Sequence, residues 1–341
     1  VPIPKTGTNQ RCTGEEYNAI TNHLKEFFVD INNKHKVYSF PDLSSAAYQQ
    51  GSNIEEDYDD FGYESESPAA AYTVNNIMSD GCFLSVADIE HALQRLKDKK
   101  NLILQGPPGT GKTWLAKRLA YALVGEKDDR KVLTVQFHPN LSYEDFIRGW
   151  RPGGEGRLQL MDGPFIELAE TARKDLNNYY VMVIEEINRG NPAQVFGEML
   201  TLLEADKRNH NSAMRLTYTE GTGEHFYLPP NLYVIGTMNI ADRSLALIDL
   251  ALRRRFAFID LQPSINERWV DWLESQYSFS QDLLMDIKSR MVKLNATITS
   301  DVQLGGQFMV GHSYVTPTSH VVDLKAWFKQ VVNTEIKPLL E

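Results

Sequence analysis

The chain alternates short apolar runs with amphipathic segments over most of its length. The apolar runs contain few charged residues and are predicted to be strands buried on both faces; they cover residues 101–105, 131–138, 179–184, 232–237 and 256–261. The amphipathic segments have apolar residues at helical spacing, and they predict helices over residues 86–99, 114–124, 143–149, 164–176 and 192–206. Because strands alternate with helices, we expect an α/β fold with a five-stranded parallel sheet sandwiched by helices.

The pattern changes at both ends of this region. Residues 1–50 hold one amphipathic stretch, which predicts a helix over 15–31 and assigns it no role. Residues 51–71 are acidic and poor in aliphatic side chains, which indicates a solvated linker, with an acidic docking patch as the alternative. We therefore expect a large α/β domain over 72–262 and a smaller, mainly helical domain over 263–341.

Two segments inside the large domain lack these patterns. Residues 151–156 are rich in glycine, and we expect a flexible insertion there. Residues 215–218 and 225–228 flank a turn-like Thr-Glu-Gly-Thr-Gly-Glu stretch and predict a hairpin. Residues 148–157 combine arginines with a tryptophan, which suits a surface that tracks a nucleic-acid backbone; a mobile surface loop is an equal alternative.

Composition narrows the class of protein. The net charge of −10, from 35 basic and 45 acidic residues, argues against a chain that covers DNA with positive charge, although a local basic patch or an assembled pore would still permit DNA contact. The two cysteines, Cys12 and Cys82, have neither metal-ligand spacing nor a disulfide framework. Their scarcity suits a reducing compartment, so we expect a cytoplasmic protein. The sequence has no apolar stretch of membrane-spanning length and no signal peptide, so no membrane association is expected.

The most specific motif follows the first predicted strand. It is a complete G-x-x-x-x-G-K-[ST] phosphate loop, made of Gly106, Pro107, Pro108, Gly109, Thr110, Gly111, Lys112 and Thr113. Successive backbone N–H groups of such a loop form an anion-binding nest at a helix N-terminus. Lys112 can reach the β- and γ-phosphates of a nucleoside triphosphate, and the Thr113 hydroxyl can coordinate Mg²⁺. A chance match in a glycine- and proline-rich turn is the alternative, which the strand before and the helix after disfavour.

Polar residues end the two predicted strands that follow. Hydrolysis of a γ-phosphate needs one carboxylate for Mg²⁺ and a second to orient water. Glu185 occupies the metal-side position and Glu186 the water-side position, at the end of the run 179–184. Asn239 ends the next strand and can bond the γ-phosphate or the attacking water. The alternatives are two solvated acids and an asparagine that caps a turn.

Three adjacent arginines, Arg253, Arg254 and Arg255, precede the last predicted strand. They either coat a surface or reach the nucleotide of a neighbouring subunit. Arginine suits the second task because its planar guanidinium is always charged and matches phosphate oxygens.

These residues together resemble the AAA+ ATPase superfamily and, more narrowly, the McrB-type GTPase subunits of the McrBC modified-cytosine restriction systems. The narrower resemblance rests on the strings at residues 135–146, 187–191, 195–198, 238–244, 251–256 and 311–314. The most specific of them is Met-Asn-x-x-Asp-Arg-Ser at 238–244. The resemblance covers about residues 72–341.

The resemblance implies an AAA+ P-loop NTPase with an α-helical lid domain over 263–341. It implies a homo-oligomeric ring, expected to be a hexamer, with GTP and Mg²⁺ between subunits and ATP as the alternative nucleotide. A McrC-like nuclease subunit would be the partner, and DNA would be bound and translocated through the assembly. By position in the matching strings, Asn239, Asp242 and Arg243 carry over as hydrolysis residues, and Arg254 and Arg255 as the finger pair.

The chain departs from the family pattern in three places. The metal-side acid is Glu185, where the family's paradigm has aspartate. The usual lid arginine is not evident, and His312 is a weak substitute for it. The end at Glu341 is expected to fall short of the family's usual C-terminus, so the lid is expected to be incomplete. The family layout also points to residues 80–84 as part of the base pocket.

Two other functions compete with this interpretation. An ATP-driven remodelling ATPase of the MoxR or dynein-related kind shares the phosphate loop, the acid pair and a similar arginine run. The string at 238–244 weighs against it. A nucleotide-gated scaffold with little turnover is the non-enzymatic alternative, and Glu185 in place of aspartate is its best support.

Overall fold

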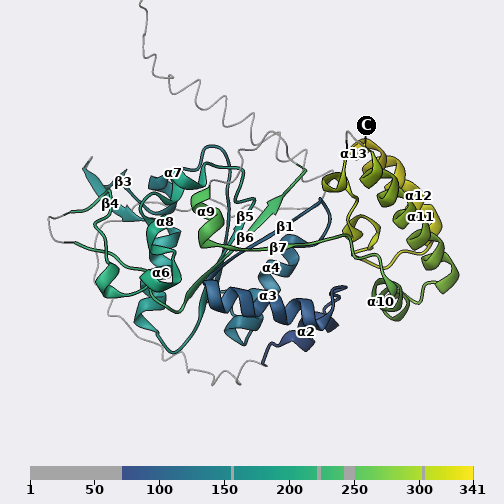
Figure 1. The fold of residues 1–341 in the computed structure, drawn as a ribbon, viewed down its shortest axis with the longest axis horizontal. Coiled ribbons are helices and arrows are strands. Elements are labelled where there is room, and N and C mark those ends of the chain that lie inside the picture. The colour runs from purple at the N-terminus through teal and green to yellow at the C-terminus, as the bar shows by residue number, and fades with distance from the viewer. Residues whose placement is uncertain (1–70, 155–156, 221–223, 242–249, 302–303, 341) are drawn as a thin grey trace, which may run out of the picture. The chain divides into compact units, whose positions relative to one another are not determined.

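A five-stranded parallel sheet forms the centre of the large domain (Figure 1). The computed structural model describes residues 71–154, 157–220, 224–241, 250–301 and 304–340, which all belong to one compact unit. The strands lie in the order β2 (Val132–Gln136), β5 (Tyr180–Glu185), β6 (Leu232–Asn239), β1 (Asn101–Gly106) and β7 (Ala257–Asp260), and all neighbours are parallel. The predicted sheet is therefore confirmed.

Helices cover both faces of the sheet because its central strands are apolar on both sides. Successive strand residues point to opposite faces, so Met182 and Ile184 of β5 enter one core and Val181 and Val183 enter the other. The first core is covered by α6 (Pro164–Lys174), α7 (Pro192–Phe196), α8 (Met199–Leu202) and α9 (Leu250–Arg255). The second is covered by α2 (Val74–Ser79), α3 (Val86–Lys99) and α4 (Lys112–Val124).

The C-terminal region has a core of its own. Its elements are α10 (Glu267–Tyr277), α11 (Gln281–Ser300), η5 (Gly306–Phe308), η6 (His312–Val315), α12 (Leu324–Val331), the π-helical turn η7 (Val332–Ile336) and α13 (Lys337–Leu340). Trp269 is fully buried in this core, and Phe83, from the loop between α2 and α3, packs into it as well. This helical region is the predicted lid.

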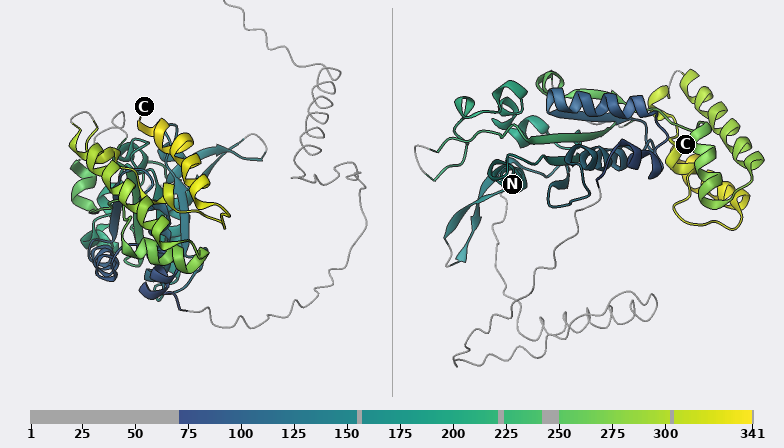
Figure 2. Two further views of the ribbon diagram at one scale, coloured as in Figure 1. Left: turned by 90° about the vertical axis from the view of Figure 1, so that its right-hand side faces the viewer. Right: turned by 90° about the horizontal axis from the view of Figure 1, so that it is seen from below.

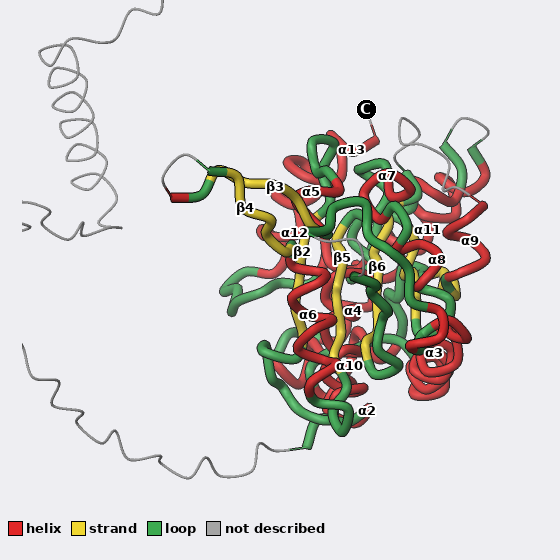
Figure 3. Tube along the Cα trace, turned by 90° about the vertical axis from the view of Figure 1, so that its left-hand side faces the viewer, coloured by secondary structure: helices red, strands yellow, loops and turns green. Residues whose placement is uncertain are grey.

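Several local predictions were wrong. The predicted helix over 143–149 ends early, as α5 (Tyr143–Phe146), and the expected flexible insertion belongs to an antiparallel hairpin of β3 (Arg148–Pro152) and β4 (Leu158–Asp162). This hairpin extends away from the sheet (Figures 2 and 3). Arg148 lies opposite Asp162 in this hairpin, and the ion pair between them supports the pairing of the strands.

The predicted helix over 192–206 is broken between α7 and α8. Gly197 has a φ of 51°, a left-handed conformation that glycine adopts without steric cost. The next residue, Glu198, turns its carboxylate to the Tyr143 hydroxyl and the Thr217 N–H, both at 2.6 Å. The predicted hairpin over 215–228 is reduced, among the described residues, to one antiparallel bridge between Met214 and Phe226. The predicted helix over 15–31 and all but the last residue of the predicted linker lie outside the described residues.

A buried arginine ties the amino-terminal ends of the central strands together. Arg208 is 3% exposed, and its guanidinium donates to the carbonyls of Leu203 and Leu232 and, at 2.6 Å, to Oδ1 of Asn101. Burial lowers the pKa of Arg208 to about 9. Asn101, also buried, donates its amide to the Leu203 carbonyl at 2.8 Å and to the Arg255 carbonyl at 3.0 Å.

We expect Arg208→Ala to lower the free energy of unfolding by about 2–4 kcal/mol, because it leaves buried carbonyl and amide oxygens without a donor. Urea unfolding followed by circular dichroism measures the change. Arg290→Ala is the control, since Arg290 is 66% exposed and pairs only with Asp286 among the described residues; its effect should stay below about 0.5 kcal/mol. Equal effects of the two substitutions would contradict the role given to Arg208.

Candidate active site

The phosphate loop lies between the end of β1 and the start of α4, as the motif requires. Gly109 and Gly111 have φ values of 75° and 73°, which place both in the left-handed region that favours glycine. A side chain at Gly106 would meet the Leu261 carbonyl oxygen at 2.3 Å. The Lys112 ammonium donates to the carbonyls of Gly106 and Pro107, at 3.0 and 2.7 Å. The backbone is thus held in the conformation of an anion nest, with a cation beside it.

A loop of the lid closes directly on the phosphate loop. The N–H of Gly311 donates to the Pro108 carbonyl at 3.0 Å, and that of Ser313 donates to the Gly109 carbonyl at 2.9 Å. A Cβ added at Gly311 would lie 2.0 Å from the Gly109 carbonyl carbon, so only glycine permits this approach. We call residues 311–314 the lid clasp. It couples the lid to the loop through main-chain contacts, which the family string at 311–314 did not specify.

The acid pair and Asn239 lie on strands adjacent to β1, at the same edge of the sheet. In the parallel register, Gly106 of β1 is paired with Asn239 of β6, and Ile184 of β5 is paired with Gly236 of β6. Glu185 ends β5. The strand order β5–β6–β1 therefore puts Asn239 between the acids and the phosphate loop.

Glu186 has an unusual backbone. Its φ is 55°, a conformation that is rare for residues other than glycine and that clusters at functional sites. Its N–H donates to Oγ1 of Thr237 at 3.2 Å, and its carboxylate accepts from Nε of Arg189 at 2.7 Å. These contacts fix both the backbone and the carboxylate of Glu186.

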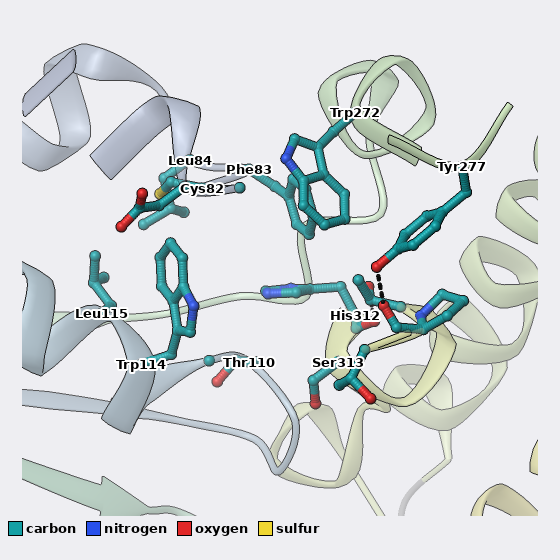
Figure 4. A pocket seen from close by; sticks show the side chains of 16 residues that line it. Cys82, Phe83, Leu84, Thr110, Trp114, Leu115, Trp272, Tyr277, His312 and Ser313 are labelled. Atoms are coloured by element: carbon teal, nitrogen blue, oxygen red, sulfur yellow. Dashed lines mark hydrogen bonds between the residues drawn. The ribbon is translucent and has the colours of Figure 1, made fainter. Parts of the chain in front are cut away.

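A cavity of about 330 Å³ adjoins the phosphate loop (Figure 4). It is lined by Thr110, Gly111 and Trp114 from the large domain and by Trp272, Tyr277 and the lid clasp from the lid. Figure 4 shows the rings of Trp114 and Trp272 at this cavity, with the imidazole of His312 directed toward Trp114. Residues 80–84, which the family layout suggested, complete the lining. The volume and the aromatic walls suit a flat heterocycle.

His312 is buried in this wall and is uncharged at neutral pH. Burial lowers the pKa of His312 to about 4. Its Nδ1 accepts from the Ser264 N–H at 3.1 Å, so the neutral ring carries its proton on Nε2, which faces Gly111. His312 can therefore donate one hydrogen bond to a ligand beside the phosphate loop, and it supplies no positive charge in place of a lid arginine.

The arginine run, residues 253–255, lies at the other end of β1 from the phosphate loop. Leu102, the second residue of β1, pairs with Ala257 of β7, so Arg255 lies beside the start of β1. The phosphate loop follows the end of the same strand. Arg254 is 65% exposed, whereas Arg255 is 8% exposed. The six residues of β1 separate the run from the phosphate loop of the same chain by about 16–20 Å. Asp242 and Arg243 lie outside the described residues.

Two of the three arginines in the segment expected to track nucleic acid form ion pairs within the chain, and the third, Arg157, is exposed. Arg148 is buried and pairs with both Asp162 and Glu224, and Arg151 pairs with Asp145 at 2.5 Å. Trp150 and Leu158 of the hairpin are 42% and 63% exposed. The pair between Arg151 and Asp145 links the hairpin to α5, so this segment is an ordered hairpin where a flexible loop was expected.

Comparison with known proteins decides the family. Residues 101–256 match the model of the AAA domain (dynein-related subfamily), and residues 286–341 match that of the McrB alpha-helical lid domain. The Type IV methyl-directed restriction enzyme EcoKMcrB subunit of Escherichia coli K12 is 43% identical over 288 residues, 81% of this chain. The chain belongs to the McrB-type AAA+ proteins.

The second relative and the lengths set the scope of this assignment. The Type II restriction enzyme BsuMI component YdiS of Bacillus subtilis 168 is 30% identical over 251 residues, which is 62% of this chain and 72% of that protein. The chain spans 60% of the length of the E. coli subunit. The McrB-type lid match disfavours the remodelling ATPase alternative.

The residues present fit a Mg²⁺ ion that is bound together with a nucleotide. Thr113 is exposed at the start of α4, and Glu185 is half-buried at the end of β5. Hydroxyl and carboxylate oxygens suit Mg²⁺, which usually takes one or two carboxylates plus substrate phosphates. The described residues contain no group of three or more His, Cys, Asp or Glu that could hold a metal without a substrate. Within the same residues, no helix is long and apolar enough to span a bilayer.

Three residues of this McrB-type site were missed by sequence reasoning. Thr237 supports the backbone of Glu186, Arg189 holds its carboxylate, and Asn188 donates to the Asn239 carbonyl at 3.4 Å. The Oδ1 atom of Asn188 is buried and has no partner among the described residues. The string 187–191 was noted as a family signal, and polar residues directly after a catalytic acid could have indicated these roles.

We expect Gly311→Ala to weaken nucleotide binding at least about tenfold, because the added methyl group would displace the phosphate loop that the lid clasp supports. Titration with a fluorescent GTP analogue measures the affinity. Gly306→Ala is the matched control in the same lid, since its Cβ would meet only Met309 at an ordinary 3.7 Å. Unchanged affinity in Gly311→Ala would show that the clasp does not support the loop.

Proposed function

We propose that this chain is the NTP-hydrolysing motor subunit of a McrBC-type, methylation-dependent DNA restriction complex. GTP with Mg²⁺ is the proposed substrate. Copies of the chain are proposed to form a ring, expected to be a hexamer. The ring works with a McrC-like nuclease and drives DNA translocation. One observation carries the enzymatic part: the phosphate loop, Asn239 and the acid pair end three adjacent parallel strands at one edge. The restriction role rests on the names of the two relatives.

In the proposed reaction each group of the chain has one task. The amides of the phosphate loop and Lys112 bind the phosphates, and Thr113 and Glu185 hold the ion, which supplies charge neutralisation at the β- and γ-phosphates. Glu186 orients the attacking water, and Asn239 bonds the γ-phosphate or that water. Asp242 and Arg243 are proposed to assist hydrolysis because of their place in the family string.

The proposed ring follows from the position of the arginine run. An arginine that stabilises the transition state must touch the γ-phosphate. In this chain the run lies beside the start of β1, whereas the phosphate loop follows the end of β1. The arginines therefore do not reach a nucleotide that is bound by the phosphate loop of the same chain. A second copy brings the run to the loop, and Arg254, the more exposed of the pair, is the proposed finger.

The preference for GTP is supported by one carboxylate of the cavity. Asp80 accepts hydrogen bonds at Oδ2 from Tyr72, Arg118 and Lys127, and among the described residues its Oδ1 accepts none. Burial raises the pKa of the Asp80 carboxyl, but the hydrogen bond from Tyr72 and the two cations outweigh it and hold that pKa below its ordinary value. A free, ionised acceptor matches the N1–H and N2–H donors of guanine, whereas adenine offers an acceptor at N1.

We expect Glu186→Gln to lower kcat for GTP at least about 100-fold while nucleotide affinity is kept, because an amide cannot orient water as a base. Steady-state phosphate release and GTP-analogue binding measure the two quantities. Glu170→Gln, which alters an ion-paired surface acid on α6, is the control. Full turnover in Glu186→Gln would remove the assigned role, and a wild-type ring that binds GTP without turnover would favour the scaffold.

We expect Asp80→Asn to reduce the ratio of kcat/KM for GTP over ATP about tenfold or more, since the loss of the anionic acceptor weakens guanine selectively. Parallel assays with the two nucleotides measure the ratio. Asp129→Asn is the matched control: Asp129 likewise bonds a tyrosine and a lysine, Tyr121 and Lys117, and lies outside the cavity lining. A wild-type preference for ATP would overturn the choice of guanine and leave the fold assignment intact.

A further inference from the structure

The carboxylate of Glu204 lies between the two arginines of the proposed finger pair. Its Oε1 atom is 2.7 Å from an NH2 nitrogen of Arg254 and 2.9 Å from the corresponding nitrogen of Arg255. Its Oε2 atom is 3.5 Å from the ammonium of Lys207. Three cations thus share one carboxylate, so the cluster keeps a net positive charge that favours an approaching phosphate.

The two arginines have different surroundings. Arg255 is 8% exposed and also donates to the Ala251 carbonyl at 2.8 Å, so it is anchored in the chain. Arg254 is 65% exposed, and within the described part of the chain Glu204 engages one of its five N–H donors. The buried Arg255 therefore holds the Glu204 carboxylate in place. The carboxylate in turn binds the exposed Arg254 and leaves most of the donors of that guanidinium available.

The backbone next to Glu204 and next to Arg254 is hydrogen-bonded to the first residue of β1. The amide of Asn101 holds the carbonyls of Leu203, next to Glu204, and of Arg255. The Lys99 ammonium donates to the Arg254 carbonyl at 3.2 Å. A hollow of about 660 Å³, lined by Arg254, Arg255 and Glu204 among others, adjoins the pair and leaves it open to a second molecule.

We propose that Glu204 is the positioning residue of Arg254: it holds the guanidinium in the pose that reaches the phosphate loop of the adjoining copy. This inference rests on the proposed trans action of Arg254. An unrestrained arginine loses rotamer entropy when it is ordered, and a misplacement of about 1 Å can cost about 10²-fold in rate. An ion pair formed before the copies meet removes much of both costs.

Mixed rings test the inference. A donor subunit, Lys112→Ala, keeps its finger and lacks a working phosphate loop, whereas an acceptor subunit, Arg254→Ala, keeps the loop and lacks the finger. Each is inactive by itself, and mixing restores interfaces where the donor's Arg254 serves the acceptor's loop. We expect Glu204→Gln in the donor to lower kcat of the mixture about 10- to 100-fold, with KM for GTP changed less than about twofold because the finger acts in the transition state.

The control places the same substitution in the other partner. Glu204→Gln in the acceptor should leave the activity of the mixture unchanged, since the acceptor's finger is already removed. Glu204→Asp in the donor, which keeps the charge on a shorter side chain, should give an intermediate kcat. Sedimentation of each mixture verifies that rings have formed.

The outcomes separate the inference from the function on which it rests. No recovery in the unmodified mixture overturns the trans action of Arg254, and with it the role of Glu204. Recovery that is undiminished by Glu204→Gln in the donor overturns the role of Glu204 alone. Equal losses with Glu204→Gln in either partner, or failure of both the Gln and Asp variants to fold, would show that the carboxylate serves the fold and would also overturn the inference.

Discussion

The parallel pairing of β1 with β6 and β7 is the constraint on which the whole arrangement depends. One end of β1 leads into the phosphate loop, and the register with β6 brings Asn239 beside it. The other end begins with Asn101, whose amide holds the backbone of Arg255 and Leu203. A strand buried on both faces is stiff, so it keeps two charged regions apart at a set distance. A slip in its register would displace the nucleotide site and the arginines together.

This separation is the physical basis of the proposed ring. In the proposed reaction an arginine stabilises the charge that develops on the γ-phosphate, and the arginines of the same chain are a strand length away. The exposure of the residues supports action on a second copy: Arg254 is 65% exposed, whereas Arg255 is 8% exposed. Under this proposal, assembly is a condition for catalysis, and hydrolysis is coupled to the contacts between subunits.

The lid contacts the phosphate loop through its main chain, whereas the family pattern would have led us to expect the side chain of a lid arginine. A neutral His312 lies beside Gly111 of the phosphate loop, and the lid clasp donates two backbone hydrogen bonds to the same loop. Phe83 extends the lid core into the loop before α3, so the cavity wall is shared between both hydrophobic cores. The shape of the cavity therefore depends on the packing of both the lid and the large domain.

The sequence by itself determined the five strands of the central sheet, their parallel direction and the phosphate loop, because these depend on local periodicity and on glycine spacing. It also placed Glu185, Glu186 and Asn239 at strand ends, where a parallel sheet gathers them. Only the tertiary structure decided which arginine is exposed, and only it brought both arginines to Glu204, which is 50 residues from Arg254 in sequence. It likewise decided the lid clasp and the pairing of Arg148, because contacts between distant segments leave no periodic signal. Burial and partner choice belong to the folded chain as a whole, whereas strand pattern and loop chemistry are written locally.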